Sequence, residues 1–288
     1  MSILVLGATG LLGNAVFRVL SESGDCPVFG TIRNVEAQQF FIPELASRLQ
    51  VVEDLRDEAQ MITLFDLLRP NVVVNCTALG KDTPQDPMKM VSVFSVLPRR
   101  LAHLCRLRQV RLVQISSDGV FSGNRGGYTE DDLPDANDPY GIAKLLGEVE
   151  GPGMITLRTS IIGHELFSRN GLLEWFLSQD GECTGYRRVI FSGFPTVALA
   201  QVIRDVVLPC PELQGIYHLA TSPISKFDLL QLVAQRYSRS TRIVPSDKLV
   251  IDRSLSADRF ARATGYVAPE WPELIDVMYS YKFGLKES

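Results

Sequence analysis

The sequence predicts an α/β fold in which a doubly wound parallel sheet is joined to a smaller α/β lobe. Over the first 165 residues, short apolar runs alternate with helical patterns, as they do when each parallel strand is followed by a crossover helix. These apolar runs are continuous and rich in β-branched residues, which indicates strands buried on both faces. After about residue 165 the spacing changes and helical patterns predominate.

The elements of the predicted sheet follow in chain order. Strands are predicted in the apolar runs 3–7, 27–32, 49–53, 71–78, 111–117 and 154–162. Helices are predicted over 11–23, 57–68 and about 90–108, and another helix begins at Pro139. Its start is well defined, because Asp138 is a good N-cap and proline suits the first helical position.

The remainder of the chain predicts the smaller lobe. Helical patterns cover 171–179, 196–207 and 225–237, with a short apolar stretch at 215–220. Ser225 and Asp228 resemble a capping box at the start of the third helix. We expect a first domain over 1–165 and an interleaved lobe over 166–288, with elements of the first domain returning around 190–222.

The composition is that of a globular protein and limits its partners. Of the 288 residues, 45% are hydrophobic and 22% are charged, which is enough apolar material for a large core. The net charge of −4 provides no general basic field, so no nucleic-acid partner is expected. No apolar run approaches the ~18 residues of a membrane span, and the first residues lack a signal-peptide layout, so no membrane association is expected.

Cysteine and histidine usage indicates the compartment and bears on metal binding. The five cysteines are scattered, odd in number and without a CxxC pair, which predicts free thiols in a cytoplasmic protein. The three histidines are far apart in sequence and lack metal-ligand spacing, so no metal site is expected.

Three glycines lie where the first predicted strand meets the first helix. Gly7, Gly10 and Gly13 have GxxGxxG spacing, a variant of the GxGxxG pattern of dinucleotide sites. Glycine permits a tight turn and lets the backbone approach a pyrophosphate, whose charge faces the amides at a helix N-terminus. A turn that only packs the helix on the strand is the alternative. The place between strand and helix favours a Rossmann-like dinucleotide site.

The end of the second strand indicates which nicotinamide nucleotide fits. An NAD site usually offers a carboxylate there to the ribose hydroxyls, whereas this chain has Thr31 and Arg33. Arginine suits a 2′-phosphate, so NADP(H) is favoured over NAD(H); a solvated surface charge is the alternative for Arg33. Asp54 and Leu55 follow the third strand and are candidates for flanking the adenine, or for an ordinary strand-end turn.

The helix that begins at Pro139 carries a polar pair on one face. At about 100° per residue, Tyr140 and Lys144 point nearly opposite to an apolar stripe. The stripe consists of Ile142, Leu145, Leu146 and Val149. Ala143 and Gly147 lie beside the polar pair, and a glycine within a helix costs about 1 kcal/mol relative to alanine. We therefore expect another group to approach this face closely.

A tyrosine and a lysine one turn apart have a chemical use. A nearby ammonium favours tyrosinate, so Lys144 is expected to lower the pKa of Tyr140 for proton transfer, and to bind a nicotinamide ribose. Ser116 and Ser117, at the carboxyl end of a predicted strand, offer a hydroxyl to a substrate carbonyl. A solvated helix face is the alternative, because YxxxK often occurs by chance. The glycine loop and the two serines favour catalysis.

Together these motifs resemble the extended short-chain dehydrogenase/reductases and, among them, the dTDP-4-dehydrorhamnose reductase group. The resemblance spans nearly the whole chain and implies an NAD(P)-binding domain over 1–165 and a substrate-binding lobe over 166–288. The segments that carry it are GATGLLG (7–13), NCTA (75–78), SSDGVFSG (116–123), YTEDDLPDANDPYGIAKLLGE (128–148), RTSIIG (158–163), SGFPT (192–196) and YHLATSPISKFDLL (217–230).

The resemblance implies roles for individual residues. Tyr140 matches the proton donor, Lys144 the lysine that lowers its pKa and binds ribose, and Ser117 the hydroxyl on the keto oxygen. With the positions above, the expected cofactor-binding residues are Gly7, Gly10, Leu11, Leu12, Gly13, Thr31, Arg33, Asp54, Leu55, Cys76, Thr77, Ala78, Ser116, Tyr140, Lys144, Arg158, Thr159 and Ser160. The expected substrate-binding residues are Asp118, Gly119, Val120, Phe121 and Tyr140.

Two positions depart from the family pattern. The residue after Asp118 is commonly aromatic, whereas this chain has Gly119, which either opens room beside the sugar or weakens its contact. The helix before the PRRLA segment commonly carries an asparagine near the cofactor, and Phe94 or Ser95 stands there. Both departures bear on catalysis and on cofactor handling.

The resemblance implies NAD(P)H-dependent reduction of a nucleotide-linked 4-keto-6-deoxy sugar, in deoxysugar and cell-surface polysaccharide biosynthesis. A nucleotide-sugar epimerase, with the same triad and a retained NAD, is one alternative. A non-catalytic, NADP-binding regulatory subunit, like that of methionine adenosyltransferase, is another. A dehydratase is disfavoured, because Asp118 is followed by Gly119 and not by glutamate. A homodimer is the expected assembly, as the commonest closed form.

Overall fold

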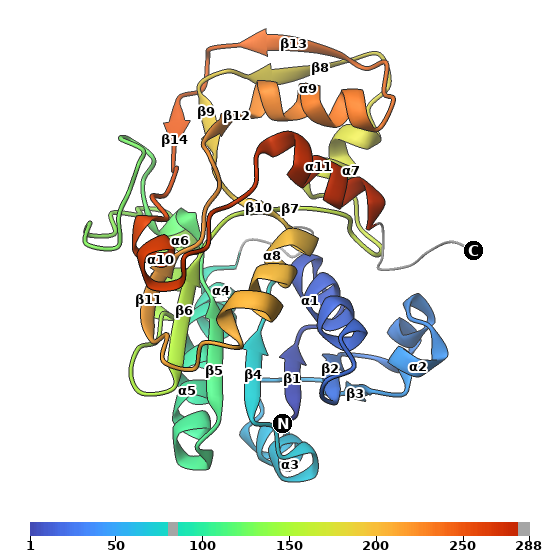
Figure 1. The fold of residues 1–288 in the computed structure, drawn as a ribbon, viewed down its shortest axis with the longest axis vertical. Helices are drawn as coiled ribbons and strands as arrows, with labels where there is room; N and C mark the ends of the chain where they lie inside the picture. The colour runs from blue at the N-terminus through green and yellow to red at the C-terminus, as the bar shows by residue number, and fades with distance from the viewer. Residues whose placement is uncertain (80–85, 282–288) are drawn as a thin grey trace.

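The computed structural model describes residues 1–79 and 86–281. Its centre is a seven-stranded sheet, all parallel, with the order β11-β6-β5-β4-β1-β2-β3 (Figure 1). The strands are β1 (Ile3–Leu6), β2 (Val28–Ile32), β3 (Leu49–Val51), β4 (Val72–Asn75), β5 (Arg111–Ile115), β6 (Met154–Arg158) and β11 (Gly215–His218). The predicted α/β fold class is confirmed. The strand order reverses between β1 and β4, where doubly wound folds bind their ligands.

Successive side chains of each strand enter different cores on the two faces of the sheet. Ile3 and Val5 lie in a core with α1 (Leu11–Glu22) and α8 (Thr196–Val202). Leu4 and Leu6 lie in a second core with α3 (Glu58–Leu68) and α5 (Leu97–Arg108). Because both faces are covered, every position of such a strand is apolar, which explains the continuous runs in the sequence.

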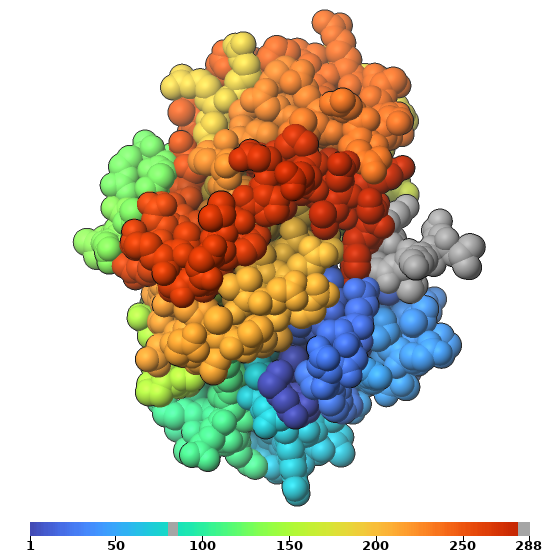
Figure 2. All heavy atoms as spheres, in the orientation of Figure 1, coloured from blue at the N-terminus to red at the C-terminus, as the bar shows by residue number. Residues whose placement is uncertain are grey.

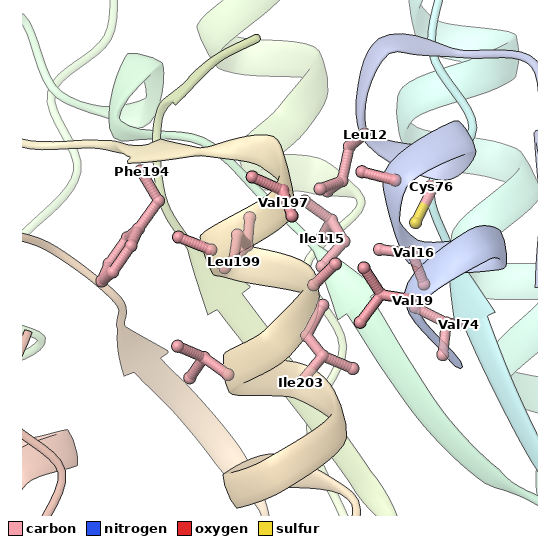
Figure 3. Packing of buried hydrophobic residues seen from close by; sticks show 14 of the residues in the cluster. Leu12, Val16, Val19, Val74, Cys76, Ile115, Phe194, Val197, Leu199 and Ile203 are labelled. Atoms are coloured by element: carbon pink, nitrogen blue, oxygen red, sulfur yellow. The ribbon is translucent and has the colours of Figure 1, made fainter. Parts of the chain in front are cut away.

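The first core joins segments that are far apart in the sequence. Figure 3 shows Leu12, Val16 and Val19 of α1 facing Val197, Leu199 and Ile203 at α8. These side chains pack over Val74 of β4 and Ile115 of β5. The helix predicted over 196–207 thus covers the sheet made by the first half of the chain, as α8 and a π-helical turn (Ile203–Val207).

The smaller lobe lies at the carboxyl ends of the central strands (Figure 1). Its strands form three small sheets: β10 (Phe194–Pro195) with β7 (Ile161–Ile162); β12 (Ile224–Ser225), β9 (Val189–Phe191) and β14 (Ile251–Asp252); and β13 (Arg242–Ser246) with β8 (Glu182–Tyr186). Its helices are α7 (Leu172–Leu177), α9 (Lys226–Arg236), α10 (Asp258–Thr264) and α11 (Trp271–Ser280). In Figure 2 the C-terminal segments, in red, lie between the lobe and the sheet domain.

The chain crosses between the two parts more than once. After β7–β10 in the lobe it returns to the sheet domain with α8 and β11.

The predicted capping residues Ser225 and Asp228 interact at the start of α9. Ser225 Oγ accepts a hydrogen bond from the Asp228 amide at 3.0 Å and donates to the Asp228 carboxylate at 2.6 Å. Residues 282–288 of the expected lobe lie outside the described residues.

The helix predicted at about 90–108 is interrupted. It consists of α4 (Pro87–Val91), a π-helical turn (Ser92–Val96) and α5. Pro98 accounts for the widened turn, because it has no amide proton for the carbonyl four residues earlier, that of Phe94, and its ring crowds that carbonyl. The remaining short helices are α2 (Pro43–Ala46) and two 3-10 turns (Val35–Phe40, Asp118–Val120).

The helix α6 (Pro139–Leu146) packs closely on its small-residue face, whereas only Leu145 and Val149 of the apolar stripe are buried or partly buried. Asp138 caps it, with Oδ1 accepting the Gly141 amide at 3.0 Å. Ile142 and Leu146 of the stripe are 42% and 51% exposed, whereas Lys144 is 8% exposed. A Cβ at Gly147 would lie 1.7 Å from the carbonyl oxygen of Phe94. The expected close approach to this face is confirmed, and the approaching group is backbone.

Candidate active site

The glycine loop stands at the switch point of the sheet. Gly7 has φ +79°, donates its amide to Thr31 Oγ1 at 2.9 Å, and accepts the Gly10 amide at 2.9 Å. A Cβ on Gly13 would lie 2.0 Å from the Gly7 carbonyl oxygen, so glycine is required for α1 to pack on the loop. Gly10 is the N-cap of α1 and supplies no side-chain cap, which leaves the first amides of the helix for an anion.

The end of β4 forms the other wall of this switch point. The Cys76 carbonyl oxygen lies 3.3 Å from the position of a Cβ on Gly7, so the two strand ends meet. Thr77 Oγ1 donates to Asn75 Oδ1 at 2.7 Å, and Ala78 is exposed. Burial raises the pKa of the Cys76 thiol to about 12, so this cysteine is a packing residue and not a nucleophile.

The candidate cofactor residues at the ends of β2 and β3 differ in exposure and in their partners. Thr31 is 2% exposed and its hydroxyl accepts the Gly7 amide, so the structure gives it a part in holding the loop. Arg33 is exposed. Asp54 accepts two hydrogen bonds of 2.7 Å from the Arg56 guanidinium, which lowers the pKa of that carboxyl. Leu55 packs partly buried on the second core. The sequence analysis did not single out Arg56.

The serine, tyrosine and lysine of the sequence analysis come together. Ser117 follows β5, and a side-chain hydrogen bond joins it to Tyr140 of α6. Ser117 Oγ also accepts the Gly119 amide at 3.0 Å and donates to Asp118 Oδ1 at 3.1 Å. Lys144, one turn below the tyrosine, donates Nζ to the Ile115 carbonyl at 2.8 Å.

The pKa values of Tyr140 and Lys144 differ from the expectation. Burial is the main cause that raises the pKa of Tyr140; the groups that lower it are Ser117, through its hydrogen bond, and Arg253. The expected lowering of this pKa by Lys144 is therefore not observed. Burial also lowers the pKa of Lys144 to about 8, against the opposing charges of Glu148 and Cys76. The lysine thus titrates near neutral pH.

Ser116 and Arg158 belong to a buried network beneath the triad. Arg158 donates Nε and Nη2 to the two Glu148 oxygens at 2.8 Å, and Ser116 Oγ donates to Glu148 at 2.7 Å. His218 Nδ1 lies 3.1 Å from the Tyr128 carbonyl and Nε2 3.3 Å from Arg158. Burial and Arg158 lower the pKa of His218 to about 3, so this ring is neutral. Arg158 is 3% exposed, so its guanidinium supports the site from below and does not face a ligand.

The expected substrate residues divide into two groups. Burial raises the pKa of the Asp118 carboxyl. Hydrogen bonds with Ser117 and Ser160 and the positive charges of Arg253 and Lys226 act in the opposite direction.

Val120 and Phe121 have no exposed surface, and the Phe121 ring stacks on Tyr128 at 4.2 Å between centroids. The prediction that Val120 and Phe121 contact the substrate is wrong in this structure, because both side chains turn into a small core at the end of the 3-10 turn. Thr159 is also buried, and its hydroxyl donates to the Ser160 carbonyl at 3.2 Å.

The smaller lobe supplies a residue that the sequence analysis missed. Arg253 follows β14 and lies 3.7 Å from the Asp138 carboxylate, and its charge reaches both Tyr140 and Asp118. Its Nε is buried and has no hydrogen-bond partner within the described part of the chain. No sequence pattern marks this arginine, because only the pairing of residues 124 and 252 brings it to the site.

Gly119 lies directly against the tyrosine ring. Its Cβ would be 3.0 Å from Tyr140 Cε1 and 3.2 Å from Ser117 Oγ. The space that glycine leaves is therefore filled by the tyrosine, and the expectation of added room beside a sugar is not met at this point.

The described residues contain no group of three or more histidine, cysteine, aspartate or glutamate side chains arranged to hold a metal ion. In the same part of the chain, no helix is long and apolar enough to cross a membrane. The hydroxyls of Ser117 and Tyr140 can protonate and polarise a carbonyl, beside a loop shaped for a pyrophosphate.

The fold and this site define the class, an extended short-chain dehydrogenase/reductase. The chain belongs to the family described by the RmlD substrate-binding domain, whose model matches residues 1–264.

Three relatives show how the sequence compares. A probable low-salt glycan biosynthesis reductase, Agl14, of Haloferax volcanii is 32% identical over 165 residues, 55% of this chain and 52% of that protein. The methionine adenosyltransferase 2 subunit beta of Xenopus laevis is 25% identical over 82% of this chain and 72% of that protein. A dTDP-4-keto-6-deoxy-D-glucose reductase of Streptomyces niveus is 31% identical over 50% of this chain and 45% of that protein. The match with the two reductases spans about half of their length.

Solved structures share the fold over nearly the full chain. A dTDP-4-dehydrorhamnose reductase from Clostridium acetobutylicum has a TM-score of 0.80 at 21% identity, over 97% of this chain and 99% of that one. One from Bacillus anthracis, in complex with NADP, has 0.77 at 18%, over 97% and 98%. The Bordetella bronchiseptica enzyme WbmG, in complex with NAD, has 0.78 at 19%, over 99% and 95%. At these identities the likeness concerns the fold.

Proposed function

We propose that this protein reduces the keto group of a nucleotide-linked 4-keto-6-deoxy sugar with a nicotinamide cofactor. The observation that carries the proposal is the convergence of Ser117, Tyr140 and Lys144 at the carboxyl end of β5, in the same sheet edge as the glycine loop. The reductases among the relatives support the substrate class. The complexes of similar folds with NADP and NAD support the cofactor class.

The residues present fit a dinucleotide. The uncapped amides of α1 suit a pyrophosphate. When bound, a reduced nicotinamide supplies hydride to the carbonyl carbon.

Tyr140 donates its proton to the keto oxygen, and Ser117 holds that oxygen by a hydrogen bond in a fixed place. Lys144, whose ammonium donates to the Ile115 carbonyl, would bind and orient the ribose. The raised pKa of Tyr140 suits this direction, because the phenol starts protonated.

The cofactor is proposed to be NADP(H). Arg33 is exposed at the end of β2, and the nearby Asp54 carboxylate is already bound by Arg56, which reduces its competition for ribose hydroxyls. We expect Arg33→Ala to weaken NADPH binding at least 10-fold and to leave NADH binding unchanged, as measured by titration of both nucleotides. Arg106→Ala, on the exposed face of α5, is the control. An equal loss for both nucleotides would contradict recognition of the 2′-phosphate.

The activity is tested by following NADPH oxidation with a panel of dTDP-, UDP- and GDP-linked 4-keto-6-deoxy sugars. Turnover that Tyr140→Phe abolishes supports the reductase. Tight NADPH binding without turnover of any keto sugar would instead favour a regulatory role, in line with the similarity to the methionine adenosyltransferase subunit. Interconversion of two sugars without net oxidation of NADPH would indicate an epimerase.

We further propose a cytoplasmic homodimer. All five cysteines are free thiols, as a reducing compartment would keep them. Ile142 and Leu146 expose adjacent apolar surface on α6, which a second copy would cover. Sedimentation of the wild type and of an Ile142→Glu variant measures the assembly; identical monomeric profiles would contradict it.

A further inference from the structure

The π-helical turn Ser92–Val96 lies beside the triad, and the proposed reaction as described above does not use it. Such widened turns are often found at functional sites. Pro98 imposes the turn by withholding an amide from the Phe94 carbonyl. As a result, both the backbone and the side chain of Phe94 are directed at α6, the helix that carries the triad.

Phe94 contacts two members of the triad. Its ring meets that of Tyr140 edge-to-face, with centroids 5.4 Å apart and planes at 84°. The Lys144 ammonium lies 5.3 Å from the Phe94 centroid, within the range of a cation–π attraction. Phe94 and Lys144 are 6% and 8% exposed, so the contact of the ring with the ammonium is made out of water, whereas Tyr140 is 38% exposed.

The turn is fastened to α6 on either side of this ring. Ser95 Oγ donates to the Ala143 carbonyl at 2.8 Å. Gly147 has no Cβ, and one built there would lie 1.7 Å from the Phe94 carbonyl oxygen. The ring of Phe94 is thus fixed relative to the helix by a hydrogen bond and by backbone contact, and not by its side-chain packing alone.

Gly119 closes the arrangement from another side of the tyrosine. A Cβ on Gly119 would approach Tyr140 Cε1 to 3.0 Å and Cδ1 to 3.3 Å, so the ring already fills the space that a side chain would take. Phe94 and Gly119, the two departures from the family pattern, therefore both lie against the ring of Tyr140. Glycine at 119 admits the ring, and phenylalanine at 94 supports it.

We propose that Phe94 and Gly119 form a bracket that holds the Tyr140 phenol in line with Ser117, and that Phe94 is a positioning residue for the reaction. The inference rests on the proposed function for its kinetic consequence. Phe94 does not touch the reacting carbonyl; it acts by fixing the ring whose hydroxyl does. Its ring also lies against the Lys144 ammonium, which is buried.

Phe94→Leu removes the ring and keeps an apolar side chain. We expect kcat to fall about 10- to 100-fold, because small misplacements of a reacting group have effects of this size, while KM and the dissociation constant of NADPH change less than 3-fold. Val93→Ala, on the same turn and equally buried, is the matched control for loss of packing. A Val93→Ala variant that loses as much kcat as Phe94→Leu would overturn the inference.

Gly119→Ala tests the other side of the bracket. The added Cβ displaces the same ring, so we expect a similar loss of kcat, and the double variant with Phe94→Leu should lose much less than the product of the two single effects. Losses that multiply would show two independent effects and would contradict a shared action on Tyr140.

A second measurement separates this inference from the proposed function. Phe94→Leu should lower the unfolding temperature less in a Tyr140→Ala background than in the wild type, because its partner ring is already absent. This coupling is expected even if no keto sugar is turned over. Equal shifts in both backgrounds would refute the contact itself, whereas coupling without turnover would leave the bracket standing and refute only the reductase.

Discussion

At the scale of single residues, burial decides the chemistry of the triad. The sequence places Tyr140 and Lys144 on one helix face, but the pKa of each depends on what covers it. Burial raises the pKa of Tyr140, so its phenol holds its proton more firmly than a free tyrosine, and burial lowers the pKa of Lys144 to about 8. With these pKa values, we expect Tyr140 to keep its proton until negative charge develops on the keto oxygen of the substrate.

Tyr140→Phe is expected to lower kcat by about 10²- to 10⁴-fold, the usual contribution of a positioned general acid. The ring contacts with Phe94 and Gly119 remain, so NADPH affinity and the unfolding temperature should stay close to those of the wild type. Stopped-flow measurement of NADPH oxidation and a binding titration check the two parts. Turnover within a few-fold of the wild type would rule out the proton-donor role.

Lys144→Met is expected to stabilise the protein while it impairs turnover. The lysine pKa is about 8 in the folded state and ordinarily 10.5, so only the unfolded state binds the proton fully between these values. Stability is therefore lost as pH falls from 10.5 to 8 and stays lost below 8. Allowing for the hydrogen bond to the Ile115 carbonyl, removal of the charge should add about 2 kcal/mol to the free energy of unfolding at pH 7.

Urea unfolding at pH 7 and pH 9.5 measures this gain, which should shrink at the higher pH. Lys89→Met, at an exposed position of α4, is the control and should change stability little at either pH. A destabilised Lys144→Met variant would show that the buried ammonium is compensated more fully than its pKa indicates.

At the scale of elements, α6 lies close to its neighbours because two of its contact positions are glycines without a Cβ. Gly141 admits the Gly119 carbonyl, and Gly147 admits the Phe94 carbonyl, where a Cβ would lie 2.2 Å and 1.7 Å from these oxygens. The helix can therefore lie close to both segments that surround the tyrosine. Its apolar residues Ile142 and Leu146 face outward while Leu145 packs on a buried cluster, so the amphipathic pattern reports only part of the buried face here.

Gly147→Ala is expected to destabilise the protein, although alanine usually stabilises a helix relative to glycine. Helix propensity alone favours alanine by up to about 1 kcal/mol, but the clash with the Phe94 carbonyl should destabilise the protein by about 1–3 kcal/mol and lower kcat by moving α6. Thermal unfolding and kcat are the measurements. Leu146→Ala, the exposed neighbour, should change neither by much. A stabilised Gly147→Ala variant would contradict the close packing.

At the scale of the whole molecule, a polar network ties the triad to the sheet edge and to the smaller lobe. Glu148 after α6, Arg158 of β6 and His218 of β11 are linked by hydrogen bonds within a region of almost no exposure. Asn124 and Tyr128 pair with Asp252 and Leu255, which carries the link to the lobe. The position of the lobe over the site depends on these contacts.

His218→Gln should reduce the acid sensitivity of the protein. The pKa of His218 is about 3 in the folded state and ordinarily 6.5, so between these values only the unfolded state binds the proton. Stability is intact above pH 6.5 and is lost as pH falls toward 3, by about 1.4 kcal/mol per pH unit. Glutamine keeps an acceptor for Arg158 and a donor for the Tyr128 carbonyl but does not titrate.

The free energy of unfolding, measured between pH 6.5 and 4.5, should therefore fall less steeply with acid in His218→Gln than in the wild type. His103→Gln removes an exposed histidine of α5 and should leave the slope unchanged. Parallel slopes for the wild type and His218→Gln would mean that the buried ring is protonated in the folded state.

The sequence by itself determined the local features. The continuous apolar runs predict the sheet, the glycine spacing and N-caps predict where α1 and α6 begin, and YxxxK with the upstream serines predicts the triad, because each depends on residues near in sequence. Only the tertiary structure decided the surroundings. Phe94, Glu148 and Arg253 reach the site from separate elements, and Val120 and Phe121 turn away from it. Burial and long-range packing set which groups touch and how they titrate, and no local pattern records them.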